Sequence, residues 1–179
     1  RMGENINFWY YGGALLAYPI ALGIALSLYF FSKYFPLQTN KNKKIYDLAI
    51  LVPAFILSII VYTKGAFVLS FTKDLARSEY TLYVNKPFYI LYGVYFIVVA
   101  LLALLNLYRK IKMPDIYFKK QTLILFIAIF IGLVFGAYFD LILCYFANYH
   151  YTWFGPVFTL FVNAVVFYLI ISPKEKIND

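Results

Sequence analysis

The stretch from Lys120 to Asn148 constrains the fold of this chain more than any other, because it is long and apolar. A helix needs about 20 apolar residues to cross a membrane. Residues four apart lie on one face of a helix. In this stretch every fourth residue is small or polar, which predicts a membrane helix whose small-residue face packs against protein. The members of this stripe are Ala128, Gly132, Gly136, Asp140, Cys144 and Asn148.

Asp140 is the acidic residue of this stretch. A carboxylate within a membrane is costly unless it meets a partner or water, so we expect it to face the bundle interior. Counting about 1.5 Å per residue from Lys120 puts it near the outer edge of the hydrocarbon core. Counting outward from His150 places it close to Thr159 and Asn163, either of which could donate a hydrogen bond. A structural hydrogen bond and a ligand or proton role both remain open.

The composition extends this interpretation to the whole chain. Apolar residues make up 64% of it and the mean hydropathy is +0.76, whereas soluble domains are about 45–50% apolar. We therefore expect an all-α integral membrane bundle, a single transmembrane domain over residues 1–179 with no room for a soluble catalytic domain. The apolar runs predict five spans, at about residues 8–31, 45–62, 87–108, 121–147 and 153–171.

One long connection, residues 63–86, separates the second and third spans. Its β-prone runs, Phe67 to Thr72 and Tyr80 to Val84, predict a small hairpin on the membrane surface. An amphipathic surface turn is the alternative.

The basic residues predict the orientation. Eleven lie on the side that holds the first connection, the third connection and the C-terminus, against five on the other side. Cytoplasmic flanks of membrane proteins carry the excess of Lys and Arg, so we expect the N-terminus outside and the C-terminus in the cytoplasm. The net charge of +8 lies at helix ends and therefore does not indicate nucleic-acid binding.

Few side chains could carry chemistry. The chain has one histidine, His150, and one cysteine, Cys144, and it lacks a glycine-rich phosphate loop, so we expect no enzyme, metal or cofactor. A second set of small residues, at four-residue spacing in the first span, predicts helix packing next to Pro19, which should kink that span. This set is Gly13, Ala17, Ala21 and Ala25. The polar residues that could converge on a ligand are Asp140, Asn163, Thr159, Tyr138, Tyr92, Tyr95 and Tyr18.

Four segments carry a resemblance to a known family. They are the entry into the third span, KPFYILYGVYFIVVALLALLNLYRK, the basic turn with its proline, RKIKMPDIYFKK, the stretch GLVFGAYFDLIL with Phe139 and Asp140, and the Gly155-Pro156 opening of the last span. Together they resemble the seven-helix N-terminal membrane region of bacterial histidine kinases, over Gly12 to Pro173. The resemblance implies a sensor in the cytoplasmic membrane, with two further helices before Arg1 and a kinase module after Asp179.

We therefore expect a signal-transducing membrane domain that is not an enzyme by itself. The expected partners are the lipid bilayer, a second copy or other membrane helices, and a small-molecule or lipid ligand. A small transporter or channel and a structural subunit of a membrane assembly remain alternatives.

Overall fold

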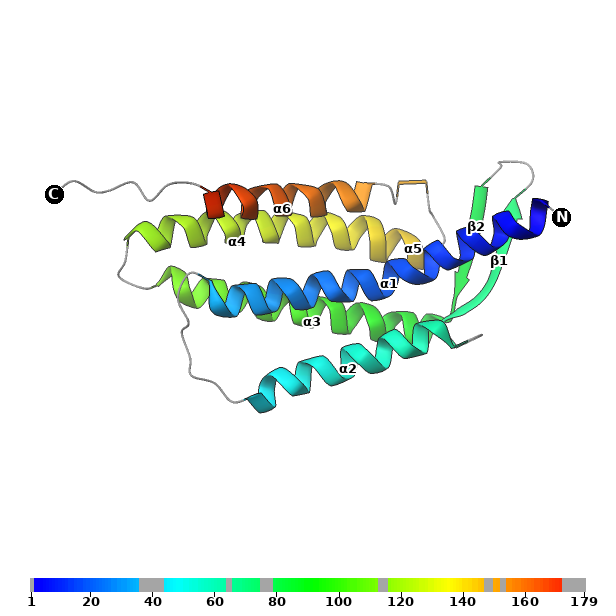
Figure 1. Cartoon of the computed structure of the whole chain (residues 1–179), viewed down its shortest axis with the longest axis horizontal. Helices are drawn as coiled ribbons and strands as arrows, with labels where there is room; N and C mark the ends of the chain where they lie inside the picture. Colours follow the sequence, from blue (N-terminus) through cyan, green and yellow to red (C-terminus); the bar gives the residue numbers. More distant parts are fainter. Residues whose placement is uncertain are drawn as a thin grey trace.

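The computed structural model is a helical bundle with a two-stranded sheet at one end (Figure 1). It describes residues 2–35, 44–63, 66–74, 79–112, 116–146, 150–151 and 154–171. The elements in chain order are α1 (Met2–Tyr34), α2 (Lys44–Tyr62), β1 (Val68–Asp74), β2 (Glu79–Val84), α3 (Lys86–Ile111), α4 (Ile116–Gly136), the π-helical turn η1 (Ala137–Ile142), α5 (Leu143–Tyr145) and α6 (Phe154–Ile171).

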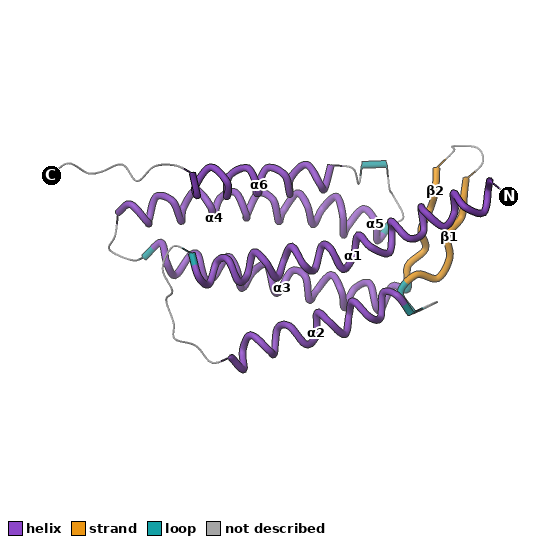
Figure 2. Tube along the Cα trace, in the orientation of Figure 1, coloured by secondary structure: helices purple, strands orange, loops and turns teal. Residues whose placement is uncertain are grey.

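Successive long helices run in opposite directions, so α1 and α3 lie parallel to each other, and α3 is the centre of the bundle (Figure 1). It packs against α1 on one side and α4 on the other, while α6 covers α4 and α2 lies against α1 (Figures 1 and 2). Pro87 stands in the first turn of α3, where a proline suits a helix start. Pro19 and Pro53 lie inside α1 and α2, and both helices continue through them.

The buried side of α3 is built from small and branched residues. Val99, Ala103 and Leu107 are four residues apart and at most 1% exposed. Ala25 of α1 belongs to the same core as Val99 and Ala103. Residues at this spacing lie along one face of a helix. The small side chains of Ala25 and Ala103 let α1 and α3 approach closely.

The predicted hairpin is confirmed. Strands β1 and β2 pair antiparallel, with Val68 opposite Val84 and Asp74 opposite Glu79. Phe67 and Val68 are buried at 1% and 3% exposure, so the base of the hairpin rests on the helix bundle. A two-stranded sheet is marginal by itself, and this contact supplies its hydrophobic support.

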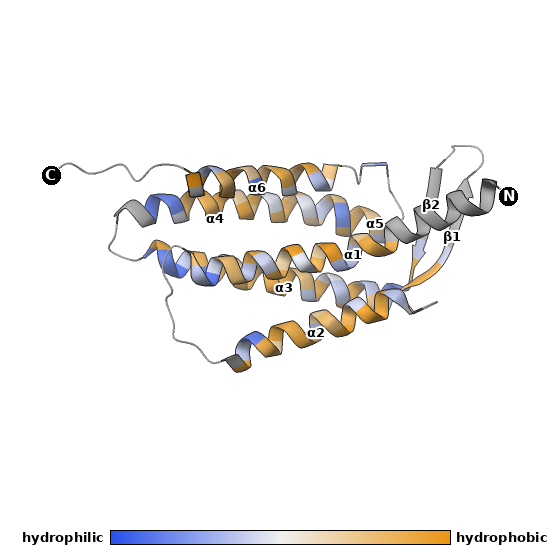
Figure 3. Ribbon diagram, viewed as in Figure 1, coloured by the Kyte–Doolittle hydropathy of each residue, from blue (hydrophilic) through white to orange (hydrophobic). Residues whose placement is uncertain are grey.

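Four helices of the described chain are long and apolar enough to cross a membrane, where the sequence predicted five spans. They are Leu15–Tyr34, Ile45–Tyr62, Lys86–Ile111 and Lys119–Tyr145. The fifth predicted span corresponds to a shorter apolar helix, Phe154–Leu169, so a fifth crossing is not confirmed. Apolar residues dominate the middle of the helices, and hydrophilic ones gather near their ends (Figure 3).

A polar cluster holds together the end of the bundle away from the hairpin. Lys110 is only 2% exposed and donates from Nζ to the backbone oxygens of Lys33, at 2.9 Å, and Phe35. Lys33 in turn forms an ion pair with Asp47 of α2, at 2.6 Å. A lysine that binds the last carbonyls of another helix satisfies groups that have no partner inside that helix.

Candidate functional site at the η1–α6 junction

The fourth apolar helix changes its winding at Asp140. The chain leaves α4 at Gly136 and forms one π-helical turn, η1, before it resumes as α5. The N–H of Leu143 donates to the carbonyl of Tyr138, five residues earlier. A π-turn inserts an extra residue into a helix, and such turns are frequent at functional sites. The turn therefore marks Asp140 as the centre of the candidate site.

The Asp140 side chain lies against the start of α6. A Cβ placed on Gly155 would meet both carboxylate oxygens at 2.0 Å and the carboxyl carbon at 2.2 Å. These distances are shorter than real Cβ contacts, so a larger residue at position 155 would force the Asp140 carboxylate to move. Gly155 itself is buried. We call this contact, with its flanking residues 138–140 and 154–155, the η1–α6 junction.

The charge of Asp140 suits this position. The first N–H groups of a helix lack partners inside the helix, and the helix start carries partial positive charge. A carboxylate beside Gly155 is therefore stabilised by α6. Among the described residues Asp140 forms no ion pair, and its side chain is exposed.

A zipper of phenylalanine rings fixes the register of α6 on the fourth helix. Phe139 stacks on Phe154 with ring centres 5.3 Å apart, and Phe135 stacks on Phe158 at 4.9 Å. Stacked rings contribute about 0.5–1.5 kcal/mol beyond the area they bury. The zipper therefore holds Asp140 opposite Gly155.

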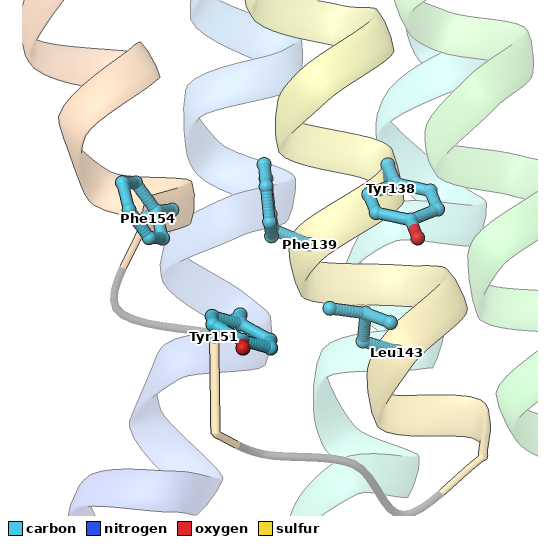
Figure 4. A pocket seen from close by; sticks show the side chains of 5 residues that line it. All are labelled: Tyr138, Phe139, Leu143, Tyr151 and Phe154. Atoms are coloured by element: carbon cyan, nitrogen blue, oxygen red, sulfur yellow. The ribbon is translucent and has the colours of Figure 1, made fainter.

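An open hollow of about 380 Å³ lies next to the junction. It is lined by Tyr138, Phe139, Leu143, Tyr151 and Phe154, whose side chains surround it in Figure 4. Asp140 is not among the lining residues, so the carboxylate and the hollow are neighbouring features and not one pocket.

Tyr89 of α3 supports η1 from the other side. Its hydroxyl donates to the backbone oxygens of Asp140, at 3.1 Å, and Leu141, at 3.0 Å. A π-turn disturbs the regular helical hydrogen bonds, so such a donor stabilises it. Tyr89 is not among the residues predicted from the sequence, although tyrosine recurs at every third position, 89, 92 and 95.

The other tyrosine candidates make structural contacts between helices. Tyr92 is 1% exposed and its hydroxyl donates to the backbone oxygen of Tyr18 at 2.9 Å. Tyr95 donates to the backbone oxygen of Ile50, in the turn before Pro53. The Tyr18 ring packs edge-on against Tyr92 at 5.4 Å. These three side chains therefore join α1, α2 and α3 through contacts of their own.

Thr159 and Asn163 of α6, which the sequence predicted as partners of Asp140, do not lie opposite it. Asp140 is level with Gly155 and not with Leu160, so Thr159 and Asn163 are not its partners; Asn163 is exposed. The cause is the geometry of the connection, because α5 extends past the start of α6 (Figure 1). The predicted level of Asp140 came from counting the same number of residues in both directions from His150, which is correct only if both helices end at the same height.

The predicted packing residues fall into two groups. Ala128 is 3% exposed, and a Cβ on Gly132 would meet Val162 of α6 at 2.5 Å, so the helices approach closely there. A Cβ on Gly136 would meet no atom within 4 Å. In α1, Ala17 is exposed and Ala21 half-buried. The surroundings of Gly13 lie outside what the structure describes.

The arrangement can hold a charge at a helix start and expose an aromatic hollow, but its described residues contain no group of three or more metal-ligating side chains. No family model, curated protein or solved structure with which the chain was compared matches it.

Proposed function

We propose that this chain is the membrane-embedded sensory or signal-transducing domain of a histidine-kinase-type receptor. In this proposal a stimulus at the η1–α6 junction alters the contact of Asp140 with Gly155, and α6 passes the change to an output module beyond Asp179. The domain performs no catalysis. The observation that carries the proposal is the carboxylate of Asp140 against the start of α6.

The surface of the helices supports placement in a membrane. Large apolar side chains are exposed along the outer helices, for example Phe55 of α2 at 70% and Phe167 of α6 at 66%. Water-soluble proteins rarely expose contiguous apolar patches of this extent, whereas lipid covers them readily. The excess of basic residues at the end away from the hairpin supports a cytoplasmic location for that end.

The junction suits transmission because it connects two elements with different roles. η1 is an irregular turn held by Tyr89 of α3, while α6 runs from the junction to the opposite end of the bundle (Figure 1). A ligand or proton can shift an equilibrium only through different affinity for two states. Neutralising Asp140 removes its attraction to the start of α6. This destabilises the state in which the Asp140 side chain contacts Gly155 relative to a state in which the contact is broken.

The test is the effect of Asp140→Asn on the spacing of α4 and α6. Spin labels are placed at Leu123→Cys and Tyr168→Cys in a Cys144→Ala chain, diluted with unlabelled chain in lipid vesicles. Both label sites are exposed. We expect Asp140→Asn to change the measured distance distribution because the carboxylate no longer holds α6. Asp47→Asn, which neutralises the carboxylate paired with Lys33, is the matched control and should leave this distribution unchanged.

An unchanged distribution in Asp140→Asn, with an altered unfolding temperature, would assign Asp140 a structural role and end the proposal. The coding sequence around the chain provides an independent check. A phosphoacceptor helix encoded after Asp179 supports the kinase type, and a different neighbouring domain excludes it.

A further inference from the structure

The outer side of α6 carries a polar side chain near the middle of the helix. Asn163 lies nine positions after Phe154 and eight before Ile171, which bound α6. Its side chain is exposed, and no hydrogen bond joins it to another part of the described chain. If α6 lies in the membrane, as proposed above, this amide lies near mid-depth, where lipid offers no hydrogen-bond partner.

The side chains around Asn163 form a regular seam. The face of α6 toward α4 contains Gly155, Val162 and Leu169, seven residues apart and all buried. The outer half of α6 is exposed, and the set of its residues that contains Asn163 has alternating spacings of four and three. These residues, which we call the α6 seam, are Pro156, Leu160, Asn163 and Phe167.

Alternating spacings of three and four are typical of a helix that pairs with another helix, and a single asparagine in such a seam fixes the register and the number of partners. Leu160 and Phe167 flank Asn163 and are 67% and 66% exposed. α6 lies at the edge of the bundle, with α4 on its inner side (Figure 1). The seam is therefore free for a partner helix.

We propose that a second copy of this chain docks on the α6 seam, with the two Asn163 side chains hydrogen-bonded to each other across a two-fold axis. An amide contains both a donor and an acceptor, so it is complementary to a copy of itself. A two-fold axis brings the same residue of both copies together, which satisfies both amides with one contact surface. The proposal rests on the membrane placement given above, but not on the signalling role.

Cysteine cross-linking of the full chain in lipid vesicles tests the seam. Single cysteines are introduced in a Cys144→Ala background, and disulfide-linked dimers are measured after mild oxidation. We expect strong cross-linking for Leu160→Cys and Phe167→Cys. Tyr168→Cys is the matched control, because Tyr168 is 63% exposed but lies on the next flank of the helix. Equal cross-linking at positions 167 and 168 would overturn the seam.

The role of the amide is tested by the dimer dissociation constant of the purified chain. Asn163→Leu should raise it about tenfold, as expected from the energy of interhelical hydrogen bonds in model membrane peptides. Asn163→Gln keeps an amide and should dimerise more tightly than Asn163→Leu. A dissociation constant that is the same in all three chains would overturn the pairing of Asn163.

Two further outcomes separate the possible failures. A purified chain that stays monomeric, while its seam cysteines cross-link to another protein in native membranes, would replace the second copy by that partner. Labelling of Asn163→Cys by a water-soluble maleimide in intact vesicles would place this part of α6 outside the lipid. That result would overturn the membrane placement of α6 as well as the proposed dimer.

Discussion

At the scale of single residues, the contact of Asp140 with Gly155 depends on the absence of one side-chain carbon. A Cβ at position 155 would overlap the carboxylate oxygens at 2.0 Å and the carboxyl carbon at 2.2 Å, so the whole carboxyl group would have to rotate away from α6. The position of the first residues of α6 and the position of the Asp140 carboxylate therefore depend on each other.

Gly155→Ala should lower the free energy of unfolding by about 1–3 kcal/mol, the usual cost of overpacking. The loss should shrink in an Asp140→Ala background, because the clash is then removed. Gly136→Ala is the control, since its Cβ meets no atom within 4 Å, and it should be neutral or stabilising by up to about 1 kcal/mol. Denaturation of the unsubstituted chain, the three single variants and the double variant in detergent measures these differences. Additive effects of Gly155→Ala and Asp140→Ala would show that the two residues do not interact.

The sequence was sufficient to single out Asp140 but not to identify what it touches. The cost of a carboxylate among apolar residues can be read from the residue types alone. The partner depends on the register of α4 on α6, which the phenylalanine zipper and the asymmetric connection determine. Similarly, Lys110 looked like one of several flanking cations, and only the packing of α1 on α3 shows that it binds the end of α1.

At the scale of elements, the hairpin was predictable and η1 was not. Alternating β-prone runs are a local property of the chain, so their pairing could be inferred from sequence. A π-turn replaces only one turn of a helix and leaves the apolar pattern around it intact. It is stabilised by a distant residue, Tyr89 of α3, through bonds to the carbonyls of Asp140 and Leu141.

The attachment of the hairpin depends on Phe67. Its ring packs against Tyr18 at 4.7 Å and against Tyr92 at 5.6 Å, and the side chain is 1% exposed. Phe67→Ala should cost about 3–5 kcal/mol of unfolding free energy, as for other buried phenylalanines. Leu69→Ala, at a strand position 59% exposed, should cost less than about 1 kcal/mol. Faster proteolysis of the 68–84 segment in Phe67→Ala than in Leu69→Ala would be the local sign of detachment. Equal rates in the two chains would contradict it.

At the scale of the whole molecule, the helices group the chain's charges at two ends. The end away from the hairpin contains Lys33, Arg109 and Lys120, while the hairpin end contains Lys86. This arrangement agrees with the grouping used to count eleven basic residues against five. The count predicts the proposed direction of the bundle, because an excess of Lys and Arg is typical of cytoplasmic flanks.

Two cysteine substitutions test this direction. In a Cys144→Ala background, Ser78→Cys, between the two strands, should react with a membrane-impermeant maleimide added to intact cells. Asn42→Cys, in the connection between α1 and α2, should react only after the cells are opened. Both positions lie in hydrophilic connections of the sequence, so labelling after lysis controls for the intrinsic reactivity of each thiol. The reverse labelling pattern would show that the bundle has the opposite orientation in the membrane. The C-terminal end of α6 would then face outward, and the η1–α6 junction could not signal to a cytoplasmic module through it.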